Sequence, residues 1–183
     1  RCKIDQEGSI SIPAKTLTDL ISSLPNTNIS IEDQGGEVQI STDNYSTKLK
    51  TLPSEEFPPI PVVENGPSMQ CKAVDLKNAI DAVVFAASTS ESQPEISGIF
   101  FQPSDKSVKL VATDRYRLAE KTLVLQSSSL TKSAIIPHKT ALELSRLLAG
   151  YTEDVTVVMA DSQMAANVGD SYLVSRLIDG QYP

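Results

Sequence analysis

The sequence predicts an α+β fold in which helices pack on antiparallel sheets. Three observations favour this fold: short runs of two-residue alternation dominate the chain, three segments have helical spacing, and a strand–helix–three-strand unit occurs twice. Each expected helix has a single apolar face, which needs a sheet or another helix to cover it. The length of 183 residues is short for two full domains and long for one.

Alternation of apolar and polar residues is the signal for half-buried strands. It is clear in residues 9–12, 28–32 and 37–41, and Gln34-Gly35-Gly36 supplies a hairpin turn between the last two. Further strands are predicted over residues 69–73, 98–102, 107–113, 116–125, 133–136, 154–159, 163–168 and 172–178. Most of the chain is therefore expected to form antiparallel sheet.

Three segments repeat their apolar residues with the helical period. We expect the first helix to start at Pro13, the second to run from Asp75 as its N-cap to Ala87, and the third to start at Pro137. Both prolines are assigned to the first helical position, where a missing N–H costs nothing. The three apolar stripes are Leu17, Leu20, Ile21 and Leu24; Leu76, Ile80, Val83, Val84 and Ala87; and Ala141, Leu144, Leu147 and Leu148.

Self-similarity at long range organises the chain. Three residue types recur 124 positions later: Pro13 as Pro137, Lys15 as Lys139 and Leu24 as Leu148. A proline-rich stretch over residues 52–67 has no periodicity and reads as a linker, so we place a domain boundary near residue 64. Residues 1–64 then form the second half of one domain, and residues 65–183 form a second domain.

Composition excludes several function classes. The net charge of −7 argues against binding nucleic acid by bulk electrostatics, although a few lysines on one face remain compatible with it. One histidine and two cysteines are too few for a usual zinc site or a disulfide framework, which makes a reducing cytoplasm the default compartment. No apolar run approaches a membrane span, and no phosphate-loop or nucleophile-elbow motif occurs. We expect no metal and no cofactor.

The segment over residues 111–119, VATDRYRLA, resembles the ATD-x-x-RL-A signature of the bacterial beta sliding clamp family, the processivity subunit of DNA polymerase III. Residues 52–58, 97–101, 135–139 and 174–183 resemble other clamp segments in the same order, so the resemblance covers essentially the whole chain. It implies the DNA-clamp fold, with residues 1–64 as the C-terminal half of the first clamp domain and 65–183 as the central domain. The third clamp domain is then absent.

The resemblance also implies how such a protein works. Clamp protomers pair as a homodimeric ring around duplex DNA, without reading its sequence. The DNA polymerase III alpha subunit, the clamp loader and other proteins insert a short peptide into a pocket between the second and third domains. The matching pocket positions are Ile96, Thr113, Arg115, Tyr116, Arg117, Leu118 and Pro183. Many clamps carry glycine and histidine where this chain has Arg115 and Tyr116.

In the same family, helices line the hole of the ring. The basic residues on the polar helix faces are therefore the candidates for weak contacts with DNA phosphates, namely Lys15, Lys77, Lys139 and Arg146. The loop over residues 88–95 matches a clamp loop near DNA but departs from some clamps at Pro94 and Glu95.

Two other classes stay open at this point. One is a hydrolase with His138 and an acid such as Glu143 or Asp170 in a cleft; the other is a β-rich interaction module with no clamp role. Duplicated helix-on-sheet halves without paired chemistry favour a scaffold over a catalyst. We therefore expect a non-catalytic processivity factor.

Overall fold

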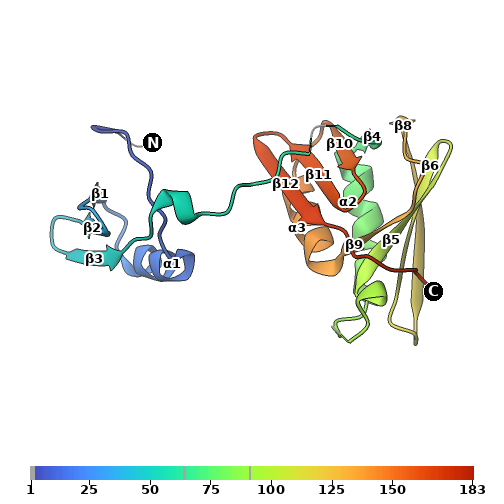
Figure 1. Ribbon diagram of the computed structural model, residues 1–183, viewed down its shortest axis with the longest axis horizontal. Coiled ribbons are helices and arrows are strands. Elements are labelled where there is room, and N and C mark those ends of the chain that lie inside the picture. Colours follow the sequence, from blue (N-terminus) through green and yellow to red (C-terminus); the bar gives the residue numbers. More distant parts are fainter. Residues whose placement is uncertain (1–2, 64, 91) are drawn as a thin grey trace. The chain divides into compact units, whose positions relative to one another are not determined.

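The computed structural model describes residues 3–63, 65–90 and 92–183, and the chain divides into two compact units (Figure 1). The first unit ends at Pro59 and the second begins at Ile60. Residue 64, near which we placed the domain boundary, lies outside the described residues, so that boundary stays a prediction. The linker before it is held by the second unit: the Tyr172 hydroxyl accepts a hydrogen bond from Val63 N (2.8 Å) and donates one to the Pro61 carbonyl (3.3 Å).

The first unit is a helix beside a three-stranded antiparallel sheet of order β1-β2-β3. Its elements are α1 (Ala14–Ser23), β1 (Ser30–Asp33), β2 (Glu37–Ser41), β3 (Ser46–Lys50) and the 3-10 turn η1 (Ser54–Glu56). The predicted hairpin turn is present, and Gly35 and Gly36 both have positive φ, at 73° and 95°, which L-residues other than glycine rarely adopt. Val38 and Ile40 of β2 are fully buried and form its core.

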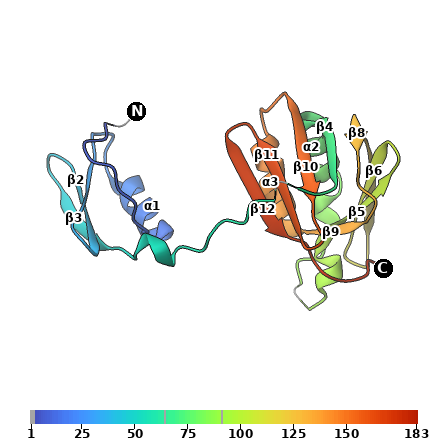
Figure 2. The same ribbon diagram turned by 45° about the horizontal axis from the view of Figure 1, so that its top comes forward.

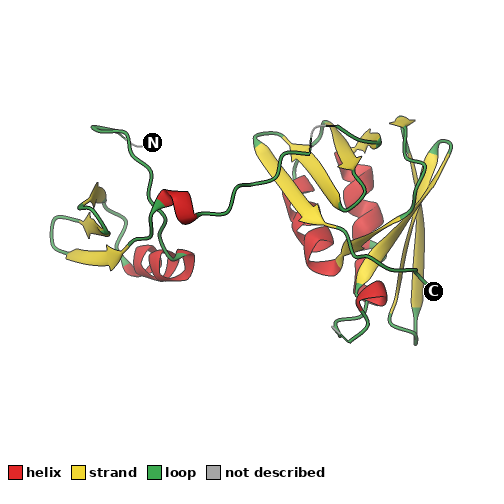
Figure 3. Cartoon of the chain, viewed as in Figure 1, coloured by secondary structure: helices red, strands yellow, loops and turns green. Residues whose placement is uncertain are grey.

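The second unit contains two helices and two antiparallel sheets (Figures 2 and 3). Its elements are β4 (Ser68–Lys72), α2 (Ala73–Asp81), the 3-10 turns η2 (Val84–Ala86) and η3 (Pro94–Ile96), β5 (Gly98–Ser104), β6 (Ser107–Thr113), β7 (Leu118–Val124), β8 (Ser127–Ser128), β9 (Ala134–Pro137), α3 (His138–Leu148), β10 (Asp154–Met159), β11 (Gln163–Val168) and β12 (Ser171–Arg176).

The strand order shows that the two halves of this unit exchange their first strands. One sheet has the order β12-β11-β10-β4-β8 and the other β7-β6-β5-β9. Strand β4, which leads into α2, therefore pairs with the strands that follow α3, and β9, which leads into α3, pairs with the strands that follow α2. Neither sheet is complete without a strand from the other half.

The helices α2 and α3 lie side by side and pack on both sheets (Figure 2). One apolar cluster joins them to the strands; it includes Leu76 and Ile80 of α2, Leu144 and Leu148 of α3, and Phe101 of β5. Cys71 of β4 is buried in the same cluster. Burial, with smaller effects from the Asp75 and Asp154 charges, raises the pKa of its thiol to about 12.

These features confirm the predicted α+β fold and its internal duplication. An isolated bridge joins Ser11 to Leu52 in the first unit, and a second joins Ile135 to Ile178 in the second unit. In both cases a residue just before a helix pairs with one just after the third strand that follows it. The repeat seen in the sequence is therefore a repeat of backbone pairing.

Some local predictions were wrong. Residues 9–12 form only the bridge at Ser11, because no neighbouring strand continues the ladder there among the described residues. Pro13 and Pro137 are N-caps, not first helical residues, since their ψ angles of 111° and 140° are extended. The second helix begins at Ala73, directly after β4, and Asp75 lies in its first turn. It ends at Asp81, and η2 follows over Val84–Ala86 with the β-branched Val83 as its N-cap.

The close contact between β5 and β9 at Gly98 gives a test of the strand exchange. A Cβ added at Gly98 would lie 2.5 Å from the Ile136 carbonyl oxygen and 2.7 Å from Ile135 Cγ2. We expect Gly98→Ala to lower the free energy of unfolding of the second unit by about 1–3 kcal/mol, measured by urea denaturation. Gln102→Ala, at an exposed position of the same strand, should cost less than about 0.5 kcal/mol; equal effects would contradict the role of Gly98.

Candidate functional site

The turn between β6 and β7 is organised by one carboxylate. Asp114 Oδ1 accepts hydrogen bonds from the backbone N–H groups of Tyr116 and Arg117, both at 3.0 Å, and Asp114 Oδ2 accepts one from Arg117 Nε, also at 3.0 Å. The Thr113 hydroxyl adds a bond to the Arg117 carbonyl (2.7 Å) and accepts one from Arg115 N (3.1 Å). Arg115 has a φ of 77°, a left-handed conformation that favours glycine.

These bonds perturb the Asp114 carboxyl group. The Arg117 backbone N–H is the largest cause, and together with Tyr116 N–H and the Arg117 charge it holds the pKa of Asp114 below its usual value of 3.8. The group is therefore ionised at neutral pH, and the turn is held in one conformation by charge-assisted hydrogen bonds.

The turn presents its side chains to solvent beside an exposed aromatic ring. Tyr116 is 97% exposed and Leu118 is 66% exposed, which is unusual for large apolar groups. The Arg117 guanidinium lies 5.6 Å from the centre of the Phe85 ring, and that ring is itself 58% exposed. Arg117 is thus fixed from two sides, by Asp114 and by Phe85.

The remaining pocket candidates, Ile96 and Pro183, lie near this edge of the sheet. Ile96 is buried in η3, directly before β5. Because β5 and β6 are antiparallel, the start of β5 lies beside the end of β6, at one end of the sheet. Pro183 follows Tyr182, whose ring stacks on Phe100 of β5 with centroids 4.8 Å apart and planes 8° apart. The structure thus brings the seven sequence-predicted residues to one end of the four-stranded sheet, with Ile96 inside and the others at the surface.

Tyr182 fixes the C-terminal segment against the sheet. Its hydroxyl forms no hydrogen bond within the described residues. Two effects act on the pKa of this hydroxyl: burial raises it, and the nearby Thr113 backbone lowers it. Burial dominates and raises the pKa of Tyr182. The backbone at Gly180 lies close to Glu95. A Cβ added at position 180 would be 2.8 Å from Glu95 Cγ.

The predicted DNA-facing cations are all in helices, but their surroundings differ. Lys77 Nζ lies 2.5 Å from Asp81 Oδ2, and Arg146 lies 2.6 Å from Glu143 Oε1. Lys15 of α1 and Lys139 of α3 are exposed and form no ion pair among the described residues. Lys15 belongs to the first unit and is therefore considered by itself.

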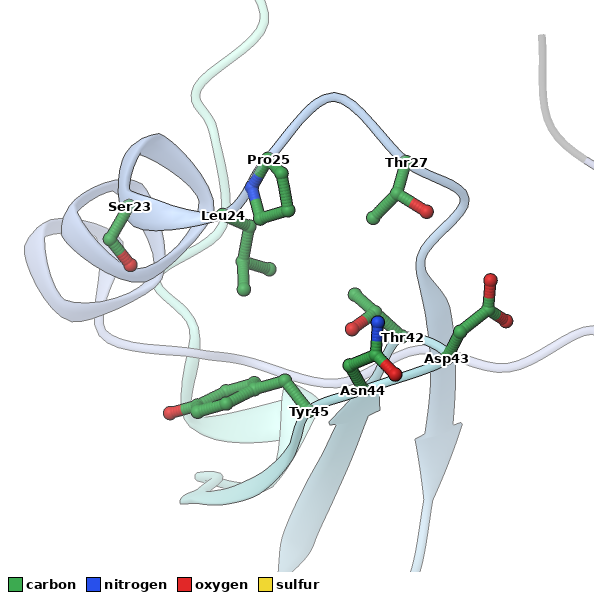
Figure 4. Close-up of a pocket in the computed structure, with 8 residues that line it drawn as sticks. All are labelled: Ser23, Leu24, Pro25, Thr27, Thr42, Asp43, Asn44 and Tyr45. Carbon is green, nitrogen blue, oxygen red and sulfur yellow. The ribbon is translucent and has the colours of Figure 1, made fainter.

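A pocket of about 320 Å³ lies within the first unit. Figure 4 shows Leu24 and Pro25, which follow α1, facing Asn44 and Tyr45 of the turn between β2 and β3. No sequence pattern predicts this pocket, because its two sides come from separate segments of the chain. Its apolar groups, notably the 45% exposed Tyr45, offer a contact surface.

The hydrolase interpretation finds little support in the geometry. Glu143 is paired with Arg146, and five residues of helix place it on a different face from His138. Throughout residues 3–63, 65–90 and 92–183, no group of three His, Cys, Asp or Glu side chains gathers as a metal ion would require. No described helix is long and apolar enough to cross a membrane.

Three residues of the site were missed from the sequence. Asp114 lies inside the ATD motif, three residues before Arg117, so an Asx-type turn was a readable signal. Tyr182 was noted only as part of the repeat. Phe85 was not singled out, although a helix continued to Ala87 would also place it off the predicted apolar stripe and leave its ring exposed.

Two family profiles cover most of the chain. One, described as the DNA polymerase III beta subunit, central domain, matches residues 70–183, and the other, the N-terminal domain of the same subunit, matches residues 1–61. With the clamp fold already described, these matches define a protein of the DNA sliding-clamp class. The chain belongs to the DNA polymerase III beta subunit family.

Named relatives agree with this assignment. The beta sliding clamp of Staphylococcus epidermidis is 31% identical over 182 residues, which cover 99% of this chain and 48% of the relative. The crystal structure of the Bacillus subtilis DNA polymerase sliding clamp has a TM-score of 0.87 at 31% identity, covering 99% of this chain and 48% of that one. A Bartonella birtlesii sliding clamp bound to griselimycin has a TM-score of 0.87 at 29% identity, covering 99% and 50%. The chain therefore spans about half the length of the relatives it matches.

The turn gives a prediction about pH. Because the pKa of Asp114 is lowered in the folded chain, its stabilisation of the turn is present above the usual value of 3.8 and is lost as pH falls through the lower folded value. We expect the amide resonances of Tyr116 and Arg117 to titrate with a midpoint below 3.8 in NMR spectra. Asp114→Asn should abolish that titration, and a midpoint at or above 3.8 would contradict the hydrogen-bonded turn.

Proposed function

We propose that this chain is part of a sliding clamp, a processivity factor that encircles duplex DNA and tethers the replicative polymerase. The collinear match to clamp domains over almost the whole chain carries this proposal. The fold supports it, since the second unit repeats one strand–helix–three-strand arrangement. A β-rich module with no clamp role would not account for that match.

The proposal includes a domain assignment. Residues 1–64 correspond to the C-terminal half of the first clamp domain and residues 65–183 to the central domain, in line with the profiles that match residues 1–61 and 70–183. Ring closure as a homodimer is part of the same proposal, and we assign it to a clamp of the length of the relatives, of which this chain spans about half.

The end of the four-stranded sheet is the proposed site for partner peptides. Leu118 offers exposed apolar surface at this end of the sheet, where Ile96 is buried, and Arg117 and Thr113 offer polar groups that can orient a peptide backbone. Because Asp114 and Phe85 already hold Arg117, a peptide does not have to order that side chain on binding. The partners in this proposal are the polymerase III alpha subunit, the clamp loader and other proteins with the clamp-binding motif.

Duplex DNA is the second proposed partner, contacted by the polar helix faces with Lys15, Lys77, Lys139 and Arg146. The acidic composition, with a net charge of −7, suits a ring that is retained on DNA by topology, because strong phosphate contacts would slow sliding. We further propose that the protein acts without catalysis of its own and in the cytoplasm, where bacterial DNA is replicated.

The pocket of the first unit lies at a surface that suits a contact between the protomers of the ring. Strand β3 is at one edge of its sheet and carries unpaired backbone groups. Leu24 and Tyr45 lie in the pocket beside the start of that strand. An edge strand next to a hollow lined by both polar and apolar side chains suits a protomer contact, so we assign the ring contact of the clamp to this surface.

A peptide titration tests the proposed site. We expect a labelled glutamine-leucine-x-leucine-phenylalanine peptide to shift the amide resonances of Thr113–Leu118 and Ile96 of the 183-residue chain. Arg117→Ala and Leu118→Ala should each weaken binding about fivefold or more, the effect of losing about 1 kcal/mol.

The matched control is Val124→Ala, which removes an equally exposed apolar side chain from the other end of β7. Its affinity for the peptide should stay within about twofold of the parent chain. Equal losses in Leu118→Ala and Val124→Ala, or well-dispersed spectra without shifts at the turn, would refute the assignment of the peptide site.

A further inference from the structure

The polar face shared by α2 and α3 is connected by a carboxylate. Asp81, at the end of α2, accepts a hydrogen bond from Lys77 Nζ at 2.5 Å, one helical turn earlier. Its second oxygen accepts a hydrogen bond from the hydroxyl of Ser145, again at 2.5 Å, across the helix–helix contact. Ser145 is a buried polar side chain, only 6% exposed. Asp81 thus bridges the two helices and fixes the Lys77 ammonium group beside itself.

Both interactions keep Asp81 ionised. The hydrogen bond from Lys77 is the largest cause, followed by that from Ser145, and they lower the pKa of Asp81 against the opposing effect of burial. At neutral pH the carboxylate therefore neutralises a large part of the positive charge of Lys77. Because Ser145 holds the carboxylate from the other side, Asp81 cannot easily turn away to release the lysine.

Helix α3 has a similar arrangement, with a different carboxylate and a different cation. Lys139, Glu143 and Arg146 are spaced so that they share one stripe of α3. Glu143 Oε1 lies 2.6 Å from Arg146 Nη1, so the carboxylate is engaged by the more distal cation. Lys139, which lies toward the start of the helix, has no ion pair within the part of the chain that the structure describes.

We infer that Asp81 and Glu143 withhold Lys77 and Arg146 from DNA phosphates, which leaves Lys139 as the principal DNA-contacting cation of the α2–α3 face. This inference rests on the proposed clamp function, in which that face meets duplex DNA. Each carboxylate competes with the phosphates for its cation, so less positive charge is available to replace counterions on DNA. The two carboxylates therefore limit the strength of the contact between this face and DNA.

Neutralising the two carboxylates tests the inference. Asp81→Asn keeps an oxygen that can accept the Ser145 hydrogen bond but removes the charge that holds Lys77, and Glu143→Gln does the same for Arg146. The binding of a short duplex to the isotope-labelled 183-residue chain is followed by NMR at about 20 mM salt. We expect each variant to bind about three- to tenfold tighter, with a salt slope steeper by about 0.9 for the phosphate gained.

Glu120→Gln is the matched control. It makes the same change in net charge and releases Lys109, whose Nζ lies 3.2 Å from Glu120 Oε1, but that pair lies on β6 and β7 and not on the helices. Its affinity for the duplex should change by less than about twofold. In the Asp81→Asn background, Lys77→Ala should remove the gain, and thermal unfolding should confirm that every variant is folded.

The outcomes separate this inference from the function on which it rests. If Lys139→Ala weakens binding but Asp81→Asn and Glu143→Gln do not strengthen it, the inference is wrong and the DNA-facing assignment stands. An equal gain in Glu120→Gln would show a net-charge effect only and would also overturn it. If the duplex shifts no resonance of α2 or α3 in any variant, the helix face does not meet DNA, and both proposals fail.

Discussion

The exchange of first strands between the two halves of the second unit is the constraint on which its structure depends. β4 completes the sheet of β10, β11 and β12, while β9 completes the sheet of β5, β6 and β7. The helices that follow β4 and β9 are therefore placed by strands of the opposite half, and they meet in one core. The site inherits this constraint, because η3 and the C-terminal segment are fixed by contacts at the edge between β5 and β9.

The two candidate surfaces use charge in opposite ways. At the β6–β7 turn, Asp114 orders a cation without burying it, so that Arg117 stays available at the surface beside Phe85. On the helix face, Asp81 and Glu143 lie against their cations along the helix axis. We proposed above that the same type of ion pair orders Arg117 for a partner peptide and weakens the contact of the helix face with DNA.

Much of the fold could be predicted from the sequence, because its apolar periodicity is strong and is repeated. The Gly35-Gly36 turn and the apolar stripes of α2 and α3 depend on local residue types, and the structure has them where the pattern indicates, whereas no residue of α1 is buried. Helix boundaries were less accessible: Asp75 has the chemistry of an N-cap, yet the start of α2 is set by the pairing of β4 with β10. Lys77 and Arg146 could be assigned to polar faces, but their ion pairs depend on side-chain geometry, and the bond to Ser145 depends on the packing of two helices.

Because the Cys71 thiol is buried, its reaction with a reagent can be used to follow the opening of the second unit. The thiolate is the reactive form of cysteine, and a pKa of about 12 leaves very little of it at neutral pH, in a strand that is paired on both sides. A thiol reagent reaches this sulfur when the core around it opens. The rate at which Cys71 is alkylated therefore reports how often the core of the second unit opens, and the chain carries its own probe of that motion.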